Sequence, residues 1–170
     1  MITINLINNQ VKSNDPKAYS LTKSNYFGEK IGEQIEYSLF EAMYLIETKK
    51  AKLQFNSKEL SLQDTEKKFS KIDKKFGIKY AVYKHLRKQG HIPKTALKFG
   101  AEFRVYKKGS GPGKGHSEWI VFTDSEKGSN SWHEFAAKNR VAHSTNKKLL
   151  LAIVDDEKDV LFYEVGWKKI

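Results

Sequence analysis

Cysteine is absent from the 170-residue sequence, proline occurs only three times, and no long run of apolar residues is present. Without cysteine the chain forms neither disulfides nor zinc–thiolate sites, and it has no thiolate nucleophile. Met1 to Asn9 lack the basic stretch and apolar core of a signal peptide, which predicts an intracellular, cytoplasmic protein. With no apolar run of membrane-spanning length, a membrane partner is not expected.

Acidic residues are also in the minority, because 20 Asp plus Glu stand against 31 Lys plus Arg, for a formal net charge of +11. Such an excess of positive charge indicates a polyanionic partner, with nucleic acid first. An acidic membrane surface fits less well, since no amphipathic helix separates its lysines from a large apolar face. A solvated, lysine-rich surface without a partner explains the same composition, so charge alone leaves the function open.

Residues 1–74 have the pattern of a small mixed α/β domain. ITINL alternates apolar and polar residues as a strand does, and NNQ supplies the turn of a hairpin. Ser38 and Glu41 form a capping box, which predicts a helix that continues to about Lys49. AKLQF is the next strand, and Ser61 with Asp64 opens a second, highly charged helix.

Residues 75–170 predict a second domain built on a mixed sheet. A helix from about residue 78 ends near Gly90, and TALKFGAEFRVYKK follows as a strand or strand pair with Gly100 as a kink. SEWIVF is another strand, and a capping box of Ser131 and Glu134 opens a helix through WHEFAAKNRVAHS. LLLAIVD then predicts a central buried strand, and VLFYEVGW a final one. This order indicates an α/β (α+β) fold.

The cationic glycine loop in FRVYKKGSGPGKGHSEWIVF does not match a phosphate-binding loop. GSGPGK is one residue too short for a Walker A motif, Gly115 stands where Ser or Thr is required, and a strand follows instead of a helix. The loop is therefore a hairpin connection. Its Lys107, Lys108 and Lys114 are either contacts to a nucleic-acid backbone or ordinary solvated lysines.

Tyr106 and His116 lie on either side of this loop. Alternation along EFRVY places Phe103 and Val105 on one face, so with these two in the core the Tyr106 hydroxyl is expected to face solvent or a cleft. Taken singly, Tyr106 is more simply an ordinary strand tyrosine, and His116 a loop histidine without a chemical task. Lys147, just before the apolar strand, has the same simple explanation.

Together, a tyrosine, a histidine and a lysine can cleave RNA without a metal. The reaction needs a base for the 2′-hydroxyl, an acid for the leaving 5′-oxygen, and a cation for the phosphorane. Histidine suits acid catalysis near neutrality, and lysine supplies a fixed charge. Tyrosine, with a reference pKa of about 10, needs neighbouring cations to act as the base, and Arg104, Lys107 and Lys147 are the candidates.

The sequence resembles the archaeal tRNA-splicing endonucleases over nearly the whole chain, most strongly from Lys79 to Asp155. YAVYKHLRKQGHIPKTALKFGAEFRVY is similar to that family's helix, basic turn and tyrosine strand, GHS to its histidine motif, and RVAHSTNKKLLLAIVD to its lysine motif. YSLFEAMYLIE is similar to its N-terminal helix. One departure is Asn146, where the family often has arginine.

This resemblance implies a restriction-endonuclease-like catalytic domain in which Tyr106 is the general base, His116 the general acid and Lys147 the stabiliser of the transition state. The choice of Lys147 over Lys148 rests on register against LLLAIVD. The implied substrate is precursor tRNA with a bulge-helix-bulge, cleaved to 2′,3′-cyclic phosphate and 5′-hydroxyl ends. The resemblance implies no metal and no other cofactor.

Further residues take roles from the same resemblance. Arg140 is implied to stack on an extruded bulge base, and Trp167 is a second stacking candidate whose simpler role is packing of the last strand. Arg104, Lys107 and Lys114 are candidate RNA contacts. The acidic turn with Asp155, Asp156, Glu157 and Asp159 is either an ordinary solvated turn or a loop that enters a cationic groove of a neighbouring subunit.

Family members of this length imply a tetramer, either of four copies or of two copies with two non-catalytic paralogous subunits, and VLFYEVGW is expected to pair with its counterpart in another subunit. Two alternative functions fit the sequence less well. A metal-dependent nuclease needs clustered carboxylates, whereas those between Phe76 and Val154 are scattered. A non-catalytic RNA-binding subunit of the same complex has no need of the triad.

Overall fold

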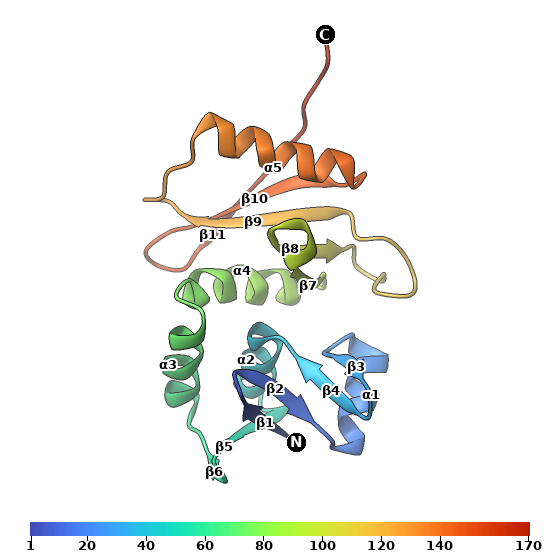
Figure 1. Cartoon of the computed structure of the whole chain (residues 1–170), viewed down its shortest axis with the longest axis vertical. Helices are drawn as coiled ribbons and strands as arrows, with labels where there is room; N and C mark the ends of the chain where they lie inside the picture. The colour runs from blue at the N-terminus through green and yellow to red at the C-terminus, as the bar shows by residue number, and fades with distance from the viewer. The chain divides into compact units, whose positions relative to one another are not determined.

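The computed structural model describes residues 1–170, which form two compact units, Met1–Gly77 and Ile78–Ile170. The N-terminal unit contains a six-stranded sheet in the order β3-β4-β2-β1-β5-β6, in which β1 and β5 are parallel (Figure 1). Helix α2 packs on this sheet, and α3 packs on α2. The elements are β1 (Ile2–Ile7), β2 (Gln10–Ser13), α1 (Pro16–Asn25), β3 (Glu29–Ile31), β4 (Gln34–Tyr37), α2 (Leu39–Glu47), β5 (Ala51–Phe55), β6 (Lys58–Glu59) and α3 (Leu62–Ile72).

Local sequence signals explain most of this unit. Ser38 and Glu41 make both hydrogen bonds of a capping box at the start of α2, and Ser61 accepts from the Asp64 backbone at the start of α3. The predicted hairpin, both helices and the strand at 51–55 are confirmed. Helix α1 and strands β3 and β4 were not predicted, because α1 buries only Ala18 and so has no apolar period.

The C-terminal unit contains a five-stranded sheet in the order β11-β10-β9-β8-β7, antiparallel except between β9 and β10. Its elements are α4 (Phe76–Lys88, which begins in the N-terminal unit), β7 (Ile92–Ala96), the 3-10 turn η1 (Leu97–Phe99), β8 (Ala101–Tyr106), β9 (Trp119–Ser125), α5 (Trp132–Ser144), β10 (Lys148–Val154) and β11 (Val160–Val165). The prediction of a mixed α/β fold is confirmed, and Gly100, with φ of 65°, is the kink between η1 and β8.

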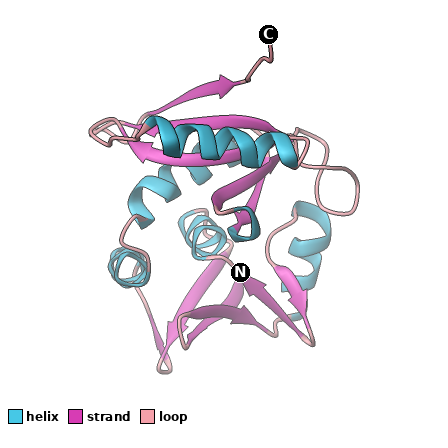
Figure 2. Ribbon diagram, turned by 45° about the horizontal axis from the view of Figure 1, so that its top comes forward, coloured by secondary structure: helices cyan, strands magenta, loops and turns pink.

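Two helices pack on opposite faces of this sheet. Helix α5 lies along β9 and β10 (Figures 1 and 2), and a core of small and large apolar side chains fills the space between them. These core residues are Ala96, Ala101, Ile120, Phe122, Ala142 and Leu149. On the other face α4 places Tyr83 against Phe103 of β8 and His85 against Phe162 of β11. No helix of the protein is both long and apolar enough to cross a membrane.

The run LLLAIVD forms β10, which lies between β9 and the edge strand β11, so the prediction of a buried strand inside the sheet is confirmed. The middle strand of the five is β9. A continuous apolar run indicates burial on both faces, but it does not specify which strands are the neighbours.

Candidate active site

Three strand ends meet at one end of the C-terminal sheet. Strand β8 finishes at Tyr106, β9 begins at Trp119 and β10 begins at Lys148. Because β8 is antiparallel to β9 while β9 and β10 are parallel, these three ends lie side by side. Glu118 joins them through its backbone, since its N–H donates to the Val105 carbonyl at 2.8 Å and its carbonyl accepts from the Lys148 N–H at 2.9 Å.

Lys147 lies between the end of α5 and the start of β10. Its backbone N–H donates to the Ala142 carbonyl in the last turn of α5 at 2.8 Å, which fixes where the side chain starts. Its Nζ donates to the Ser117 carbonyl at 3.1 Å, so the ammonium group reaches the residue next to His116. Partial burial, and secondarily the positive charge of Arg104, lower the pKa of Lys147 from its ordinary value.

Tyr106 is only 5% exposed, so of the two expected positions for its side chain, solvent or a cleft, the structure contradicts the first. Register pairs Arg104 with Ile120, a residue of the core beneath α5. The face that carries Arg104 and Tyr106 is therefore packed as well, because helices cover both sides of the sheet. Alternation alone could not reveal this second cover.

His116 is exposed in the connection between β8 and β9. This connection contains two tight turns, closed by Ser110 N–H to Lys107 O at 3.1 Å and Lys114 N–H to Gly111 O at 3.0 Å. It leads directly into β9, with no helix after the glycines, so a phosphate-binding loop is excluded as predicted. His116 is thus carried on a loop, while Ser117 beside it is buried.

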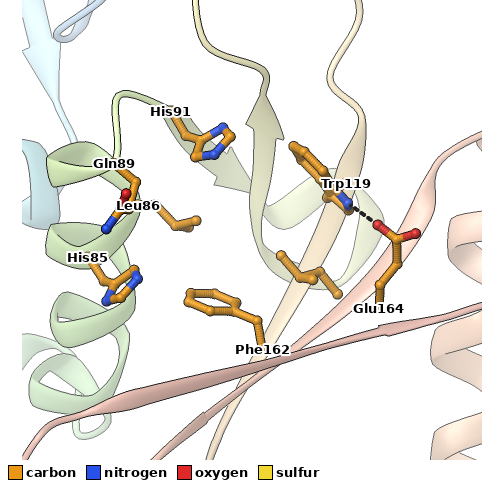
Figure 3. Close-up of a pocket in the computed structure, with 8 residues that line it drawn as sticks. His85, Leu86, Gln89, His91, Trp119, Phe162 and Glu164 are labelled. Atoms are coloured by element: carbon orange, nitrogen blue, oxygen red, sulfur yellow. Dashed lines mark hydrogen bonds between the residues drawn. The ribbon is translucent and has the colours of Figure 1, made fainter.

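His91, which the sequence analysis does not identify, contacts this region from the position directly before β7. Its Nδ1 is 3.2 Å from the Tyr106 carbonyl oxygen, and its ring meets Trp119 edge-on with centroids 5.5 Å apart. It also lines a cavity of about 190 Å³ on the sheet face opposite α5 (Figure 3). Figure 3 shows Phe162 beside His85 and Trp119 beside His91, with Glu164 accepting a hydrogen bond from the Trp119 indole nitrogen. No local sequence signal marks His91.

The candidate RNA contacts differ in their surroundings. Lys107 lies 2.9 Å from a carboxylate oxygen of Glu118, whereas Lys114 is exposed at the tip of the loop. Arg140 is exposed on α5, with its Nε 3.4 Å from the Ala136 carbonyl oxygen. The Trp167 ring packs against His143 of the same helix, with centroids 4.5 Å apart.

The acidic turn between β10 and β11 is ordered by one of its own carboxylates. Asp155 Oδ1 accepts from the backbone N–H groups of Glu157 and Asp159, both at 2.9 Å. Asp156 forms an ion pair with Lys127, while Glu157 and Asp159 are exposed. Asp155 therefore stabilises the turn, whatever else the turn contacts.

Metal ligands do not gather at this end of the sheet or elsewhere, since no group of three or more His, Asp or Glu side chains is placed to hold an ion. The chemistry available near this end of the sheet is that of a phenol at the end of β8 (Tyr106), an imidazole in the loop before β9 (His116) and an ammonium group just before β10 (Lys147). Such groups carry out acid, base and charge-stabilising functions at a phosphate.

Comparison with known proteins gives matches over both units. Residues 76–162 match the model of the tRNA intron endonuclease catalytic C-terminal domain, and residues 2–65 match that of the tRNA intron endonuclease N-terminal domain. The chain is 38% identical to the tRNA-splicing endonuclease of Thermococcus kodakarensis over 170 residues, 99% of each protein. It is 42% identical to that of Pyrococcus furiosus (84% of this chain, 82% of the relative) and 46% identical to that of Nanoarchaeum equitans (79% and 90%). The chain belongs to the tRNA intron endonuclease family.

Proposed function

We propose that this protein is a tRNA-splicing endonuclease that removes introns from precursor tRNA by cutting both splice sites of a bulge-helix-bulge RNA. Family membership over both units supports this function. The observation that carries it is the contact from Lys147 Nζ to the Ser117 carbonyl, because it brings an ammonium group from the residue before β10 to the residue that follows His116. Residues 75–170 carry the reaction in this proposal, and residues 1–74 form the accompanying N-terminal domain.

The reaction is an internal transesterification. Tyr106 takes the proton of the 2′-hydroxyl, the 2′-oxygen bonds to phosphorus, and the bond from phosphorus to the 5′-oxygen breaks. His116 gives a proton to that 5′-oxygen, while Lys147 stabilises the extra negative charge on the phosphorane. One proton is taken and one is given, and the products are a 2′,3′-cyclic phosphate and a 5′-hydroxyl. No step requires a metal ion or other cofactor.

RNA recognition in this proposal uses Arg140 for stacking on a bulge base, with Trp167 as a second stacking surface, and Arg104, Lys107 and Lys114 for phosphates. Guanidinium and indole planes stack on bases with about 1–3 kcal/mol each. The net charge of +11 favours RNA association in general. Arg140 is the stronger stacking candidate of the two, because it is exposed, whereas one face of Trp167 is covered by His143.

Cleavage of a bulge-helix-bulge RNA by the purified chain in EDTA tests the proposed function. We expect both splice sites to be cut, with cyclic phosphate on the upstream product, and the matched control His116→Ala to cut about 100-fold more slowly or worse. Cleavage only after a divalent metal is added would contradict the mechanism. RNA binding without cleavage, with activity appearing only when a catalytic paralogue is added, would instead identify a non-catalytic subunit.

A further inference from the structure

A single carboxylate, that of Glu118, lies between the chain neighbours of two proposed catalytic residues. Its Oε2 is 2.9 Å from Lys107 Nζ, and its Oε1 is 3.2 Å from Lys148 Nζ. Lys107 directly follows Tyr106, and Lys148 directly follows Lys147. The Glu118 side chain is only 16% exposed, whereas those of the two lysines are 66% and 53% exposed, so both lysines reach inward to a largely buried charge.

The backbone of Glu118 reinforces these ion pairs. Its N–H is bonded to Val105 of β8 and its carbonyl to Lys148 of β10, while the preceding carbonyl, that of Ser117, accepts from Lys147 Nζ. One residue directly before β9 thus joins the ends of β8 and β10 through both backbone and side chain. Tyr106 and Lys147 directly precede the two lysines that pair with Glu118, and His116 lies two positions before Glu118 itself.

The connections continue to the edge of the sheet. Lys148 Nζ is also 3.4 Å from Glu164 Oε1 of β11, and Glu164 Oε2 accepts from the Trp119 indole N–H at 2.8 Å (Figure 3). We call Lys107, Glu118, Lys148, Glu164 and Trp119 the strand-end network. It spans the loop after β8 and the strands β9, β10 and β11 at the end where the proposed triad lies.

A carboxylate at this position is unfavourable for RNA binding. It repels the phosphate backbone, and it pairs with two lysines that would otherwise be available to neutralise phosphates. Partly buried ion pairs also contribute little to stability on balance, because desolvation offsets much of their attraction. A positioning function accounts for the residue better than RNA affinity does.

We propose that Glu118 is a positioning residue for the reaction proposed above: its carboxylate holds the ends of β8 and β10 at the separation at which Tyr106 and Lys147 act on one phosphate. The inference rests on the proposed function. The same ion pairs make Lys107 and Lys148 less available for phosphate binding. The main function of Lys107 in this proposal is therefore its ion pair with Glu118 and not contact with RNA. Glu118 is therefore expected to raise the cleavage rate at saturating RNA and to weaken RNA binding.

Glu118→Gln tests this inference, because the amide keeps the shape and the backbone bonds while the charge is lost. We expect the single-turnover cleavage rate at saturating bulged RNA to fall about 10- to 100-fold, since small displacements of reacting groups have effects of that size. We also expect RNA to bind more tightly, and the slope of log affinity against log salt to become steeper by about 1 to 2, as two lysines are freed. Glu118→Asp keeps the charge and is expected to recover part of the rate.

Glu36→Gln is the matched control. Glu36 is also partly buried and ion-paired, to Lys12 at 3.6 Å, but it belongs to the N-terminal unit. This variant changes the net charge by the same amount, so it reports the general effect of charge on RNA binding and is expected to leave the cleavage rate unchanged. Thermal unfolding of each variant separates a loss of fold from a loss of rate.

Lys148→Met removes one of the two ion pairs of Glu118 and tests the same inference if Glu118→Gln does not fold. It is expected to lower the cleavage rate, and the double variant with Glu118→Gln is expected to be no slower than the slower single variant. A wild-type rate in a folded Glu118→Gln, or strictly additive losses in the double variant, would overturn the positioning function. If the wild-type chain fails to cleave bulged RNA both alone and together with a non-catalytic paralogous subunit, the proposed function falls and this inference falls with it.

Discussion

Lys147 is a proposed catalytic residue whose surroundings lower its pKa. Its ammonium group is partly buried and lies near the positive charge of Arg104, and both effects favour its neutral form. A neutral lysine cannot stabilise the phosphorane. Because the pKa of Lys147 is below that of an ordinary lysine, its charge is lost at a lower pH than is usual, and cleavage is expected to decline as the pH rises through that value.

Replacing Arg104 is expected to move this alkaline decline. In Arg104→Ala the burial of Lys147 remains but the neighbouring charge is removed, so the pKa of Lys147 rises and the decline shifts to higher pH. Single-turnover rates at saturating RNA across the alkaline range measure the shift independently of weakened binding. Arg140→Ala, which removes an exposed arginine from α5, is the control and is expected to leave the position of the decline unchanged. A decline that stays in place or moves to lower pH in Arg104→Ala would contradict this account of Lys147.

His116 allows a test of acid catalysis at the same scale. His116→Ala is expected to lower the cleavage rate about 100-fold or more while RNA affinity stays close to that of the wild type, because a lost proton donor affects the chemical step and not binding. His133→Ala removes another exposed histidine, at the start of α5, and serves as the control. Equal losses of affinity and rate in His116→Ala would point to a binding role instead.

At the scale of elements, the acidic residues of the turn between β10 and β11 are expected to have two different functions. One is to stabilise the turn, and the other is to contact a neighbouring subunit. Asp155→Ser removes the acceptor of two backbone N–H groups, so we expect a lower melting temperature even in the absence of other subunits. Glu157→Ser removes an exposed charge from the same turn and is expected to leave the melting temperature unchanged but to weaken assembly. Differential scanning calorimetry of both variants measures the melting temperature, and light scattering measures assembly. Glu157→Ser with wild-type mass and activity would argue against docking through this residue.

The sequence predicted those elements whose signals are local. Capping boxes marked the starts of α2 and α5, and alternation or continuous apolar character marked most strands. Helix α1 was missed because Asp15 and Pro16 signal a helix start but no apolar period follows. The position of β10, the burial of Tyr106 and the contacts of His91 and Glu118 depend on pairing between strands distant in sequence. Residue types and spacing alone do not specify such pairings.

On the scale of the whole molecule, strand β11 leaves apolar side chains uncovered at the edge of its sheet. Leu161 and Tyr163 are 62% and 54% exposed, and they flank the half-buried Phe162. An open edge with exposed apolar residues favours pairing with another strand, which is consistent with the predicted association through VLFYEVGW.

Charge placed on this edge is expected to disrupt the tetramer that the family resemblance implies. Leu161→Asp together with Tyr163→Lys should lower the mass measured by light scattering to that of a smaller species and reduce cleavage of an RNA with two splice sites. Leu97→Asp, at an even more exposed apolar position between β7 and β8, controls for the general effect of surface charge. A doubly substituted chain that keeps the wild-type mass would exclude β11 from the interface.

The central claim is that the RNA supplies its own nucleophile to a triad that acts without metal, and one substituted substrate tests it most directly. Two bulge-helix-bulge RNAs are compared in EDTA, one fully ribose and one with a single 2′-deoxy nucleotide immediately 5′ of one scissile phosphate. We predict that the second RNA is cut at its unmodified site at the normal rate and not at the modified one, because no 2′-oxygen is present there to attack phosphorus. Cleavage at the 2′-deoxy position would show that water or a protein group is the nucleophile, and it would contradict the mechanism.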